Sequence, residues 1–415
     1  MSFFLIMVIA SALSLLRGFV VATTLTPETF GIYAMVVSAG GFASGLLGAG
    51  RIEATMKTFP RAWMGGFPGG VCAHADALTR TVALRGAIAG ILGVVAILVV
   101  ARWSLLLPAT ATVGVAVAVA AIGIQISAVR ASGNLRSLGV TTFCRSALAL
   151  IACWFGTIIL GWLGAVLGEV AAAVVGILVA QGAARRAAAA VKEKDLVHNL
   201  FGADETTATG GRYLLFALLL TSTAAYLDRL YVGSLLGSAA AGRYGFLMLF
   251  VTGAAVVAGV VVQKVGPAIV RAQHQGTKVS ELLMTVLKWG AIQAALVVAG
   301  MACVGLIASL QPFEELTRRY GLDGDALLAA TALAAAQWAV LLDWILMAID
   351  RERIVFLSAG IYFFCILAMA AWFATAGASI AEIVGALAAA RFIQVVAQVT
   401  FILASSATLG GKGAS

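Results

Sequence analysis

Ionisable side chains inside long apolar segments are the residues of this sequence that could do chemistry. Arg17 lies in the apolar segment 3–22, and the adjacent Asp228 and Arg229 lie in the segment 212–234. In a membrane, a charged side chain at this depth costs at least ~2.5–3.5 kcal/mol, so it must face protein or water. Arginine's planar fork suits bidentate binding of phosphate oxygens. These positions are therefore candidates for binding an anionic group.

A further arginine, Arg391, lies near the middle of the segment 380–403, too far from either end for its stem to reach the interface easily. We predict that Arg17, Asp228, Arg229 and Arg391 bind substrate through phosphate or sugar groups. The alternative is that Asp228 pairs with an arginine in a structural ion pair that holds the chain together.

Three carboxylates also lie within apolar segments, and they suit a different task. Buried carboxylates are the usual carriers of proton or sodium coupling in transporters. Glu169 and Asp343 are the coupling candidates, with Glu382 weaker because it lies near the start of its segment. Each of them could instead neutralise a neighbouring arginine.

Composition defines the class of protein that these side chains must work in. The chain of 415 residues is 62% hydrophobic and 11% charged, whereas a soluble chain carries roughly 25% charged residues. Apolar runs of about 20 residues, the length that crosses a bilayer, recur throughout. We predict an all-α polytopic membrane protein with about twelve transmembrane helices. The expected spans are 3–22, 31–50, 81–100, 104–128, 140–160, 162–184, 212–234, 242–263, 283–309, 326–349, 354–374 and 380–403.

Basic residues predict the orientation of these spans. Most loop lysines and arginines fall on the side of the two termini, and the opposite loops hold Arg102, Arg243, Arg318 and Arg319. The positive-inside rule then places both termini in the cytoplasm. The polar segment 185–211 divides the spans evenly, and we interpret it as a cytoplasmic linker. The loop 51–80, rich in glycine and proline, has no soluble-domain character, and the simplest interpretation is an interfacial helix.

The resulting domain prediction has four parts. A six-helix bundle covers 1–184, the linker 185–211, a second six-helix bundle 212–403 and a cytoplasmic tail 404–415. Because each half starts on the same side, the two halves are expected to be parallel repeats related by an axis along the membrane normal.

The two halves also share a pattern. Arg17 is followed by Gly31 and Tyr33, and Asp228 is followed at matching distances by Gly242 and Tyr244. In sequence these stretches resemble polysaccharide-type flippases. The first stretch reads Thr26-Pro27-Glu28-Thr29-Phe30-Gly31-Ile32-Tyr33. The second runs from Leu227-Asp228-Arg229-Leu230 to Gly242-Arg243-Tyr244, and Gly266-Pro267 matches the cytoplasmic end of the eighth helix of these proteins.

These flippases are the O-antigen branch of the multidrug/oligosaccharidyl-lipid/polysaccharide exporter superfamily. The resemblance implies a bacterial inner-membrane protein whose two bundles enclose a central cavity that opens alternately to each side. It implies a polyprenyl-diphosphate-linked oligosaccharide as cargo, for exopolysaccharide or O-antigen synthesis. A polysaccharide polymerase and glycosyltransferases are the partners it suggests, beside membrane lipids.

Other functions are disfavoured by what the sequence lacks. It contains no P-loop, nucleophile elbow or metal-ligand spacing, and its five cysteines show no CxxC pattern. We therefore expect no enzyme, no cofactor and no metal. Basic residues form no block that would bind nucleic acid despite the net charge of +9. The main alternative function is a cation-coupled multidrug exporter of the same fold, in which carboxylates dominate the cavity. A membrane scaffold for glycosyltransferases and a lipid II flippase are further alternatives.

Overall fold

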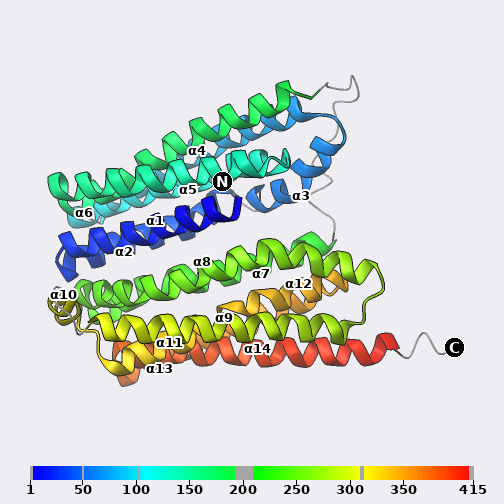
Figure 1. The fold of residues 1–415 in the computed structure, drawn as a ribbon. Helices are drawn as coiled ribbons and strands as arrows, with labels where there is room; N and C mark the ends of the chain where they lie inside the picture. Colours follow the sequence, from blue (N-terminus) through cyan, green and yellow to red (C-terminus); the bar gives the residue numbers. More distant parts are fainter. Residues whose placement is uncertain (1–2, 49–50, 101, 192–208, 309–312, 411–415) are drawn as a thin grey trace. The chain divides into compact units, whose positions relative to one another are not determined.

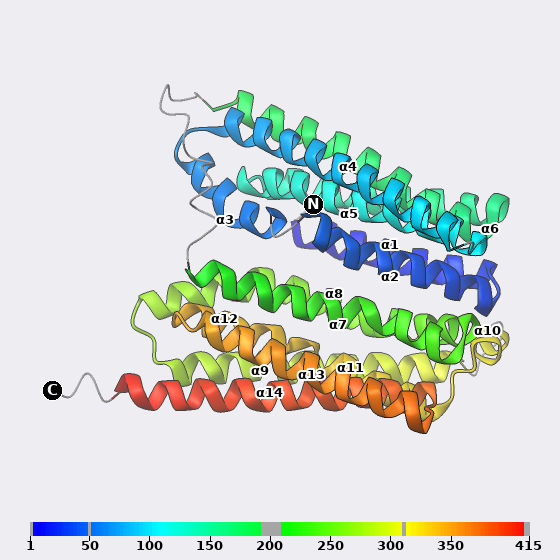
Figure 2. The ribbon, with the colours of Figure 1, turned by 180° about the vertical axis from the view of Figure 1, so that it is seen from behind.

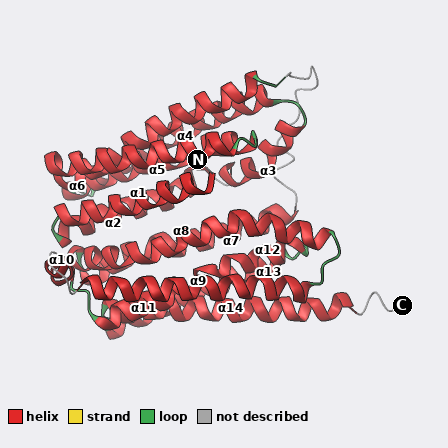
Figure 3. Ribbon diagram, viewed as in Figure 1, coloured by secondary structure: helices red, strands yellow, loops and turns green. Residues whose placement is uncertain are grey.

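The computed structural model describes residues 3–48, 51–100, 102–191, 209–308 and 313–410. In this part of the chain the regular structure is helical, with no strand (Figure 3). Long apolar segments account for this result, because a chain in lipid must satisfy its own backbone hydrogen bonds and a helix does so within one segment.

Two compact units can be distinguished from the contacts within the chain. Unit 1 comprises Met1–Gly211 together with Tyr226–Gly242, and unit 2 comprises Arg212–Ala225 together with Arg243–Ser415. The helices of unit 1 are α1 (Phe3–Thr24), α2 (Pro27–Gly48), α3 (Arg51–Met64), α4 (Pro68–Val99), the short 3₁₀ helix η1 (Trp103–Leu105), α5 (Leu106–Ala131) and α6 (Leu135–Ala189). Helix α7 (Thr209–Leu236) contributes to both units.

The helices of unit 2 follow α7. They are α8 (Ser238–His274), which starts in unit 1, α9 (Val279–Ala308), α10 (Phe313–Tyr320), α11 (Gly324–Ala335), the 3₁₀ segment η3 (Ala336–Ala339), α12 (Val340–Ala348), α13 (Glu352–Ala376) and α14 (Ile380–Gly410). Within each unit the long helices run alongside one another, with α5 beside α2, α4 and α6 in unit 1 and α14 beside α11 and α13 in unit 2 (Figures 1 and 2).

The expected number of spans is confirmed once two helices are examined. In the described residues, 10 helical segments are long and apolar enough to cross a membrane. Helix α6 counts once among them although it contains two predicted spans, and α7, which carries Asp228 and Arg229, is not counted. With these two additions the structure has about twelve membrane helices, as predicted.

Helix α6 is a hairpin of two arms, residues 135–160 and 162–189. Gly161 between them adopts φ 60° and ψ −138°, a conformation open to glycine. Beyond it the arms pack backbone against backbone, since a Cβ on Gly164 would collide with the carbonyl of Gly156. A Cβ on Gly168 would likewise meet the backbone of Ala152 and Cys153. Glycines in these arms therefore allow a spacing that larger residues would block.

The two glycines of the repeated pattern have a matching role. Within unit 1, a Cβ on Gly31 would collide with the carbonyl of Ser238, and a Cβ on Gly242 would collide with that of Pro27. The starts of α2 and α8 therefore touch through their backbones. Thr26 and Thr29 fix the start of α2, because each hydroxyl accepts a hydrogen bond from the other residue's backbone N–H, at 3.3 Å and 3.0 Å. The repeat thus marks a contact between its own two copies.

Helix boundaries differ from the predicted spans in several places. The segment 51–80 contains a helix as expected, α3, and also the first turns of α4, which starts at Pro68, a residue favoured at the first helical position. Helix α6 continues to Ala189, into the segment interpreted as the linker. Residues 192–208 of that segment lie outside the described residues. Helix α14 extends to Gly410 into the predicted tail, whose residues 411–415 are likewise outside the described part. The predicted domain bounds stay a prediction.

We expect Gly164→Ala to destabilise the α6 hairpin. The added methyl group meets the backbone of Gly156, which cannot move aside as a side chain could. Overpacking of this kind costs about 1–3 kcal/mol, and the apparent melting temperature of the purified protein should fall by about 2–10 °C. The matched control is Gly182→Ala on the same helix, where the nearest atom to a Cβ is the end of the flexible Arg186 side chain at 4.0 Å. Equal melting temperatures for the two variants would contradict the packing argument.

Candidate functional site

Arg17 of α1 forms an ion pair with Glu169 of the second arm of α6. Arg17 Nη1 lies 2.7 Å from Glu169 Oε2, and the side chains are 20% and 12% exposed. The other carboxylate oxygen, Oε1, accepts a hydrogen bond from the Tyr33 hydroxyl at 2.8 Å. Tyr33 is the tyrosine of the repeated Gly-x-Tyr pattern, so one residue of the pattern makes this hydrogen bond.

The pair changes the roles expected for both residues. Glu169 neutralises Arg17, which is the structural alternative left open for the carboxylates above. Removing one partner would leave an uncompensated charge at membrane depth. Arg17 retains one unused hydrogen-bond donor, because its buried Nε has no partner in the described part of the chain. Substrate binding by Arg17 and coupling by Glu169 stay predictions.

Arg229 of α7 has a neutral partner. Its Nη1 donates to the Ser38 hydroxyl of α2 at 2.8 Å, within unit 1. The neighbouring Asp228 is 9% exposed, and its Oδ1 accepts the backbone N–H of Arg229 at 2.6 Å. The Nε of Arg229 is buried and has no partner among the described residues. The guanidinium therefore keeps donors that an anionic ligand could use.

Asp343 of α12 is a carboxylate held by an amide and not by a cation. Its Oδ1 accepts a hydrogen bond from Gln398 Nε2 of α14 at 2.6 Å. The same amide nitrogen lies 3.3 Å from the hydroxyl of Ser358 on α13. Among the described residues no basic side chain lies within 4.0 Å of this carboxylate, in contrast to Glu169. Asp343 is thus the coupling candidate without a direct ion pair, although Arg391 lies within electrostatic range of it.

Arg391 also belongs to unit 2 and lies on the same face of α14 as Gln398, two turns earlier, within electrostatic range of Asp343. Its Nη1 donates to Gln394 Oε1 at 2.6 Å, and its guanidinium carbon lies 5.5 Å from the centre of the Tyr362 ring. Both partners are uncharged, and a cation over an aromatic face is attracted by the ring quadrupole. Arg391 is therefore held in place without losing its charge.

The helix that carries Asp343 is interrupted within its span. The 3₁₀ segment η3 separates α11 from α12, and such a segment in mid-helix often marks a functional hinge. Helix α9 packs on it closely, since a Cβ on Gly290 would meet the ring of Trp338. One turn further along α9, Gln293 is 3% exposed, and neither amide atom has a partner in the described residues. The interior of unit 2 thus contains a buried amide, that of Gln293, that could bind a polar ligand near the break between α11 and α12.

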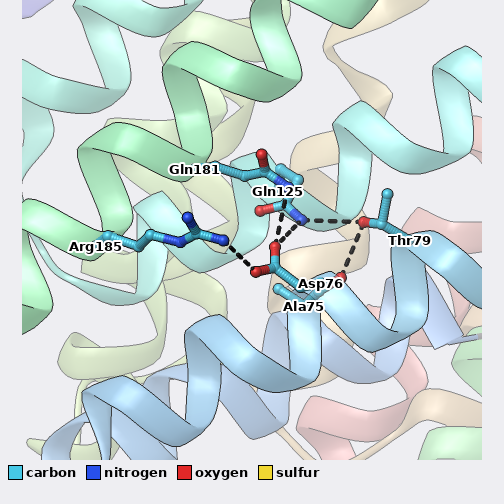
Figure 4. Close-up of polar contacts among 6 residues, drawn as sticks. All are labelled: Ala75, Asp76, Thr79, Gln125, Gln181 and Arg185. Atoms are coloured by element: carbon cyan, nitrogen blue, oxygen red, sulfur yellow. Dashed lines mark hydrogen bonds and ion pairs between the residues drawn. The ribbon is translucent and has the colours of Figure 1, made fainter.

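A further polar cluster, centred on Asp76, was missed in the sequence (Figure 4). Asp76 Oδ1 accepts hydrogen bonds from Gln125 Nε2 at 3.1 Å and Gln181 Nε2 at 2.9 Å, and Arg185 Nη2 lies 2.7 Å from Oδ2. Gln125 also donates to the Thr79 hydroxyl at 3.0 Å. These contacts join α4, α5 and the second arm of α6.

The missed cluster follows from the boundary error at α4. Because the predicted span began at residue 81, Asp76 lay outside it and was not considered as a candidate. Two features of the sequence indicated a longer helix. Pro68 is a residue favoured at a helix start, and Asp76 and Thr79 are three residues apart, a spacing that places both on one helix face.

In the described residues no group of three or more His, Cys, Asp or Glu side chains could hold a metal ion.

Comparisons with known proteins identify the fold and go no further. No protein-family model matches the chain, and no curated protein sequence is similar to it. Solved structures do match. An inward-facing multidrug resistance MATE family transporter of the MOP superfamily aligns with a TM-score of 0.66 at 12% identity, covering 100% of this chain and 97% of that one.

Two further structures agree. A MATE in complex with MaL6 has a TM-score of 0.67 at 12% identity, covering 98% of this chain and 96% of its own. The Vibrio cholerae MATE transporter VcmN, solved as a point mutant, has a TM-score of 0.56 at 17% identity, covering 98% of this chain and 95% of its own. The chain therefore has the fold of MATE transporters along its whole length. These likenesses concern the fold alone, and none of them supports the O-antigen flippase branch.

We expect the Arg17–Glu169 pair to be structural. Arg17→Met should cost about 3–5 kcal/mol, since it leaves a buried carboxylate without a cation. The double variant Arg17→Met/Glu169→Gln should recover much of this loss, because both charges leave together and Tyr33 keeps a partner. Thermal unfolding of the purified protein measures both effects. The control is Arg102→Met at an exposed position, where a change within about 0.5 kcal/mol is expected. A single variant as stable as this control would free Arg17 for substrate.

Proposed function

We propose that this protein is a cation-coupled exporter of amphipathic organic molecules, with Asp343 as the coupling carboxylate. The observation that carries the proposal is the environment of Asp343, which is bonded to Gln398 and has Arg391 within electrostatic range but in no direct ion pair. In lipid a carboxylate without a direct ion pair is costly to keep charged, so uptake of a proton or a metal cation stabilises it. Binding and release of that cation is the elementary step of coupling.

The surroundings of Asp343 support this role. It follows the 3₁₀ segment η3 by one turn, so a change in its charge acts on the part of the helix whose hydrogen bonding is already irregular. Transporters commonly place ion sites at interrupted helices near mid-membrane. The MATE fold adds support by analogy, since a structural neighbour is a multidrug resistance transporter.

Asp343→Asn is the direct test. In proteoliposomes loaded with ethidium, wild-type protein should drive efflux when a proton or sodium gradient is imposed. The variant should lose at least about ten-fold of the driven rate, since one coupling charge is gone while Gln398 keeps a partner. The matched control is Asp325→Asn, an exposed carboxylate in the first turn of α11 on the same span. Driven efflux that persists in Asp343→Asn would remove Asp343 from the mechanism.

A second function is favoured by Arg229 and Arg391, which hold charge at membrane depth against neutral partners. A diphosphate group would satisfy their free donors with charge-assisted hydrogen bonds. This second function is the flipping of a polyprenyl-diphosphate-linked oligosaccharide across a bacterial inner membrane, with both termini in the cytoplasm. A polysaccharide polymerase and glycosyltransferases would then be its partners. Arg17 takes no part in this version, because Glu169 already neutralises it.

Arg229→Ala and Arg391→Ala test this second function one at a time. Each should weaken binding of a polyprenyl diphosphate carrying one sugar by at least about ten-fold, the loss expected for one charged hydrogen bond. Fluorescence titration of the purified protein measures the affinity. Arg102→Ala and Arg136→Ala remove exposed positive charges and are the controls. If wild-type protein does not bind the lipid, or if the controls weaken binding equally, the flippase hypothesis fails.

A further inference from the structure

An apolar groove runs along unit 1 between α4, α5 and the second arm of α6. Its volume is about 710 Å³, and its lining includes Gly86, Gly90 and Val94 of α4, Val113 and Val117 of α5, and Val174 of α6. The groove is open along one side, since Ile91 at its edge is 64% exposed. Thr110 is a hydroxyl among its lining residues, and it bonds the carbonyls of Leu106 and Leu107 in its own helix.

Glycine makes the groove deep. A Cβ on Gly90 would lie 3.6 Å from Val113, an ordinary contact, so a side chain could be accommodated there only by occupying the groove itself. The missing side chain at Gly90 therefore adds to the depth of the groove.

One end of the groove is polar, and the helical register shows which residues form it. On α5 the lining ends at Ala121, and one turn further is Gln125. On α6 it ends at Ile177, and the next turns bring Gln181 and then Arg185. Gln125, Gln181 and Arg185 all contact Asp76, so the cluster of Figure 4 closes the groove at this end.

The polar end carries exposed positive charge. Asp76 forms an ion pair with Arg185 and offsets part of its charge while orienting its guanidinium group. The Arg185 side chain is nevertheless 64% exposed. Arg80 on α4 is also exposed, and it lies two turns before Ala87 on the helix face that lines the groove. An anionic group at this end would meet two guanidinium groups.

The length of the groove matches one leaflet of a bilayer. From Gly86 to Val95 the helix rises about 14 Å at 1.5 Å per residue, close to half of the ~30 Å hydrocarbon core. Its polar end is the end of α4 that the distribution of basic residues places at the cytoplasmic surface. Gly86 lies about 9 Å beyond Arg80 along α4 at 1.5 Å per residue, so the distal part of an acyl chain fills the groove when its headgroup lies at Arg80 and Arg185.

We propose that this groove is a binding site for one acyl chain of an anionic phospholipid of the cytoplasmic leaflet, with the headgroup phosphate at Arg80 and Arg185. The lipid is a resident ligand and not the transported cargo, so the site is independent of the proposed function. A drug-sized apolar molecule fits less well, because the lining offers no free polar group to orient it. Phospholipid supplies the combination of an apolar chain and a phosphate that the groove and its polar end require.

Two pairs of variants separate the chain site from the headgroup site. Gly90→Phe fills the groove, and Gly93→Phe on the same helix is its control, because a Cβ there meets nothing within 4 Å and Gly93 does not line the groove. Arg185→Gln removes the charge at the polar end. Its control is Arg186→Gln, where the side chain is exposed and bonds the Gly182 carbonyl of its own helix, not Asp76.

Native mass spectrometry of the detergent-purified full chain, titrated with phosphatidylglycerol or with phosphatidylcholine of the same acyl chains, gives the affinities. We expect one molecule of phosphatidylglycerol to bind more tightly than phosphatidylcholine. Gly90→Phe should weaken both lipids by at least about ten-fold through lost chain burial. Arg185→Gln should weaken phosphatidylglycerol alone by at least about five-fold, the effect of one basic residue near a lipid surface.

The outcomes are decisive in both directions. Equal affinity for the two lipids, with Gly90→Phe and Gly93→Phe indistinguishable, would mean that lipid covers this face without a site, and the proposal would be overturned. Selective loss in Arg186→Gln instead of Arg185→Gln would overturn the headgroup assignment. Should Gly90→Phe fail to fold, Arg185→Gln still decides, since it leaves the groove intact and changes only its polar end.

Discussion

The constraint on which the structure depends is that lipid supplies neither water nor counter-ions. Every backbone group and every charge within the spans must therefore find its partner inside the protein. The described charges meet this demand in three ways. Arg17 has a carboxylate, Arg229 and Arg391 have neutral hydrogen-bond acceptors or an aromatic ring, and Asp343 has an amide. Only the first arrangement is a direct ion pair, whereas Arg391 and Asp343 act on each other without contact, and this difference separates structural positions from candidate functional ones.

Close backbone approach is the second requirement, because helices in lipid gain little from burying apolar surface against each other. Gly31 and Gly242 illustrate it, since each would collide with a carbonyl across the contact if it carried a Cβ. The repeated pattern in the two halves is then explained by packing for its glycines and by hydrogen bonding for Tyr33. Gly31, Gly242 and Tyr33 therefore have structural roles, and a substrate site must be formed by other residues.

The sequence was sufficient for the spans, and for good physical reason. Length and hydropathy determine whether a segment crosses a bilayer, so about twelve helices could be counted before the fold was seen. Boundaries outside the apolar runs could not be found in this way. The start of α4 at Pro68 shows it, because helix α4 continues beyond the hydrophobic segment into polar surroundings where hydropathy carries no signal. The error removed Asp76 from consideration and with it the polar cluster of α4, α5 and α6.

Partner choice was the other limit of the sequence. Arg17 and Glu169 are far apart along the chain, and nothing in either segment shows that they form a pair 2.7 Å apart. By composition Glu169 and Asp343 were equivalent, two carboxylates within apolar runs. Tertiary structure distinguishes them, because Glu169 contacts an arginine directly whereas Asp343 contacts the amide of a glutamine. The same argument reverses the ranking of the arginines. Arg17, which introduced the repeat, is the least free of them, and Arg229 and Arg391 are the cations still able to attract an anion.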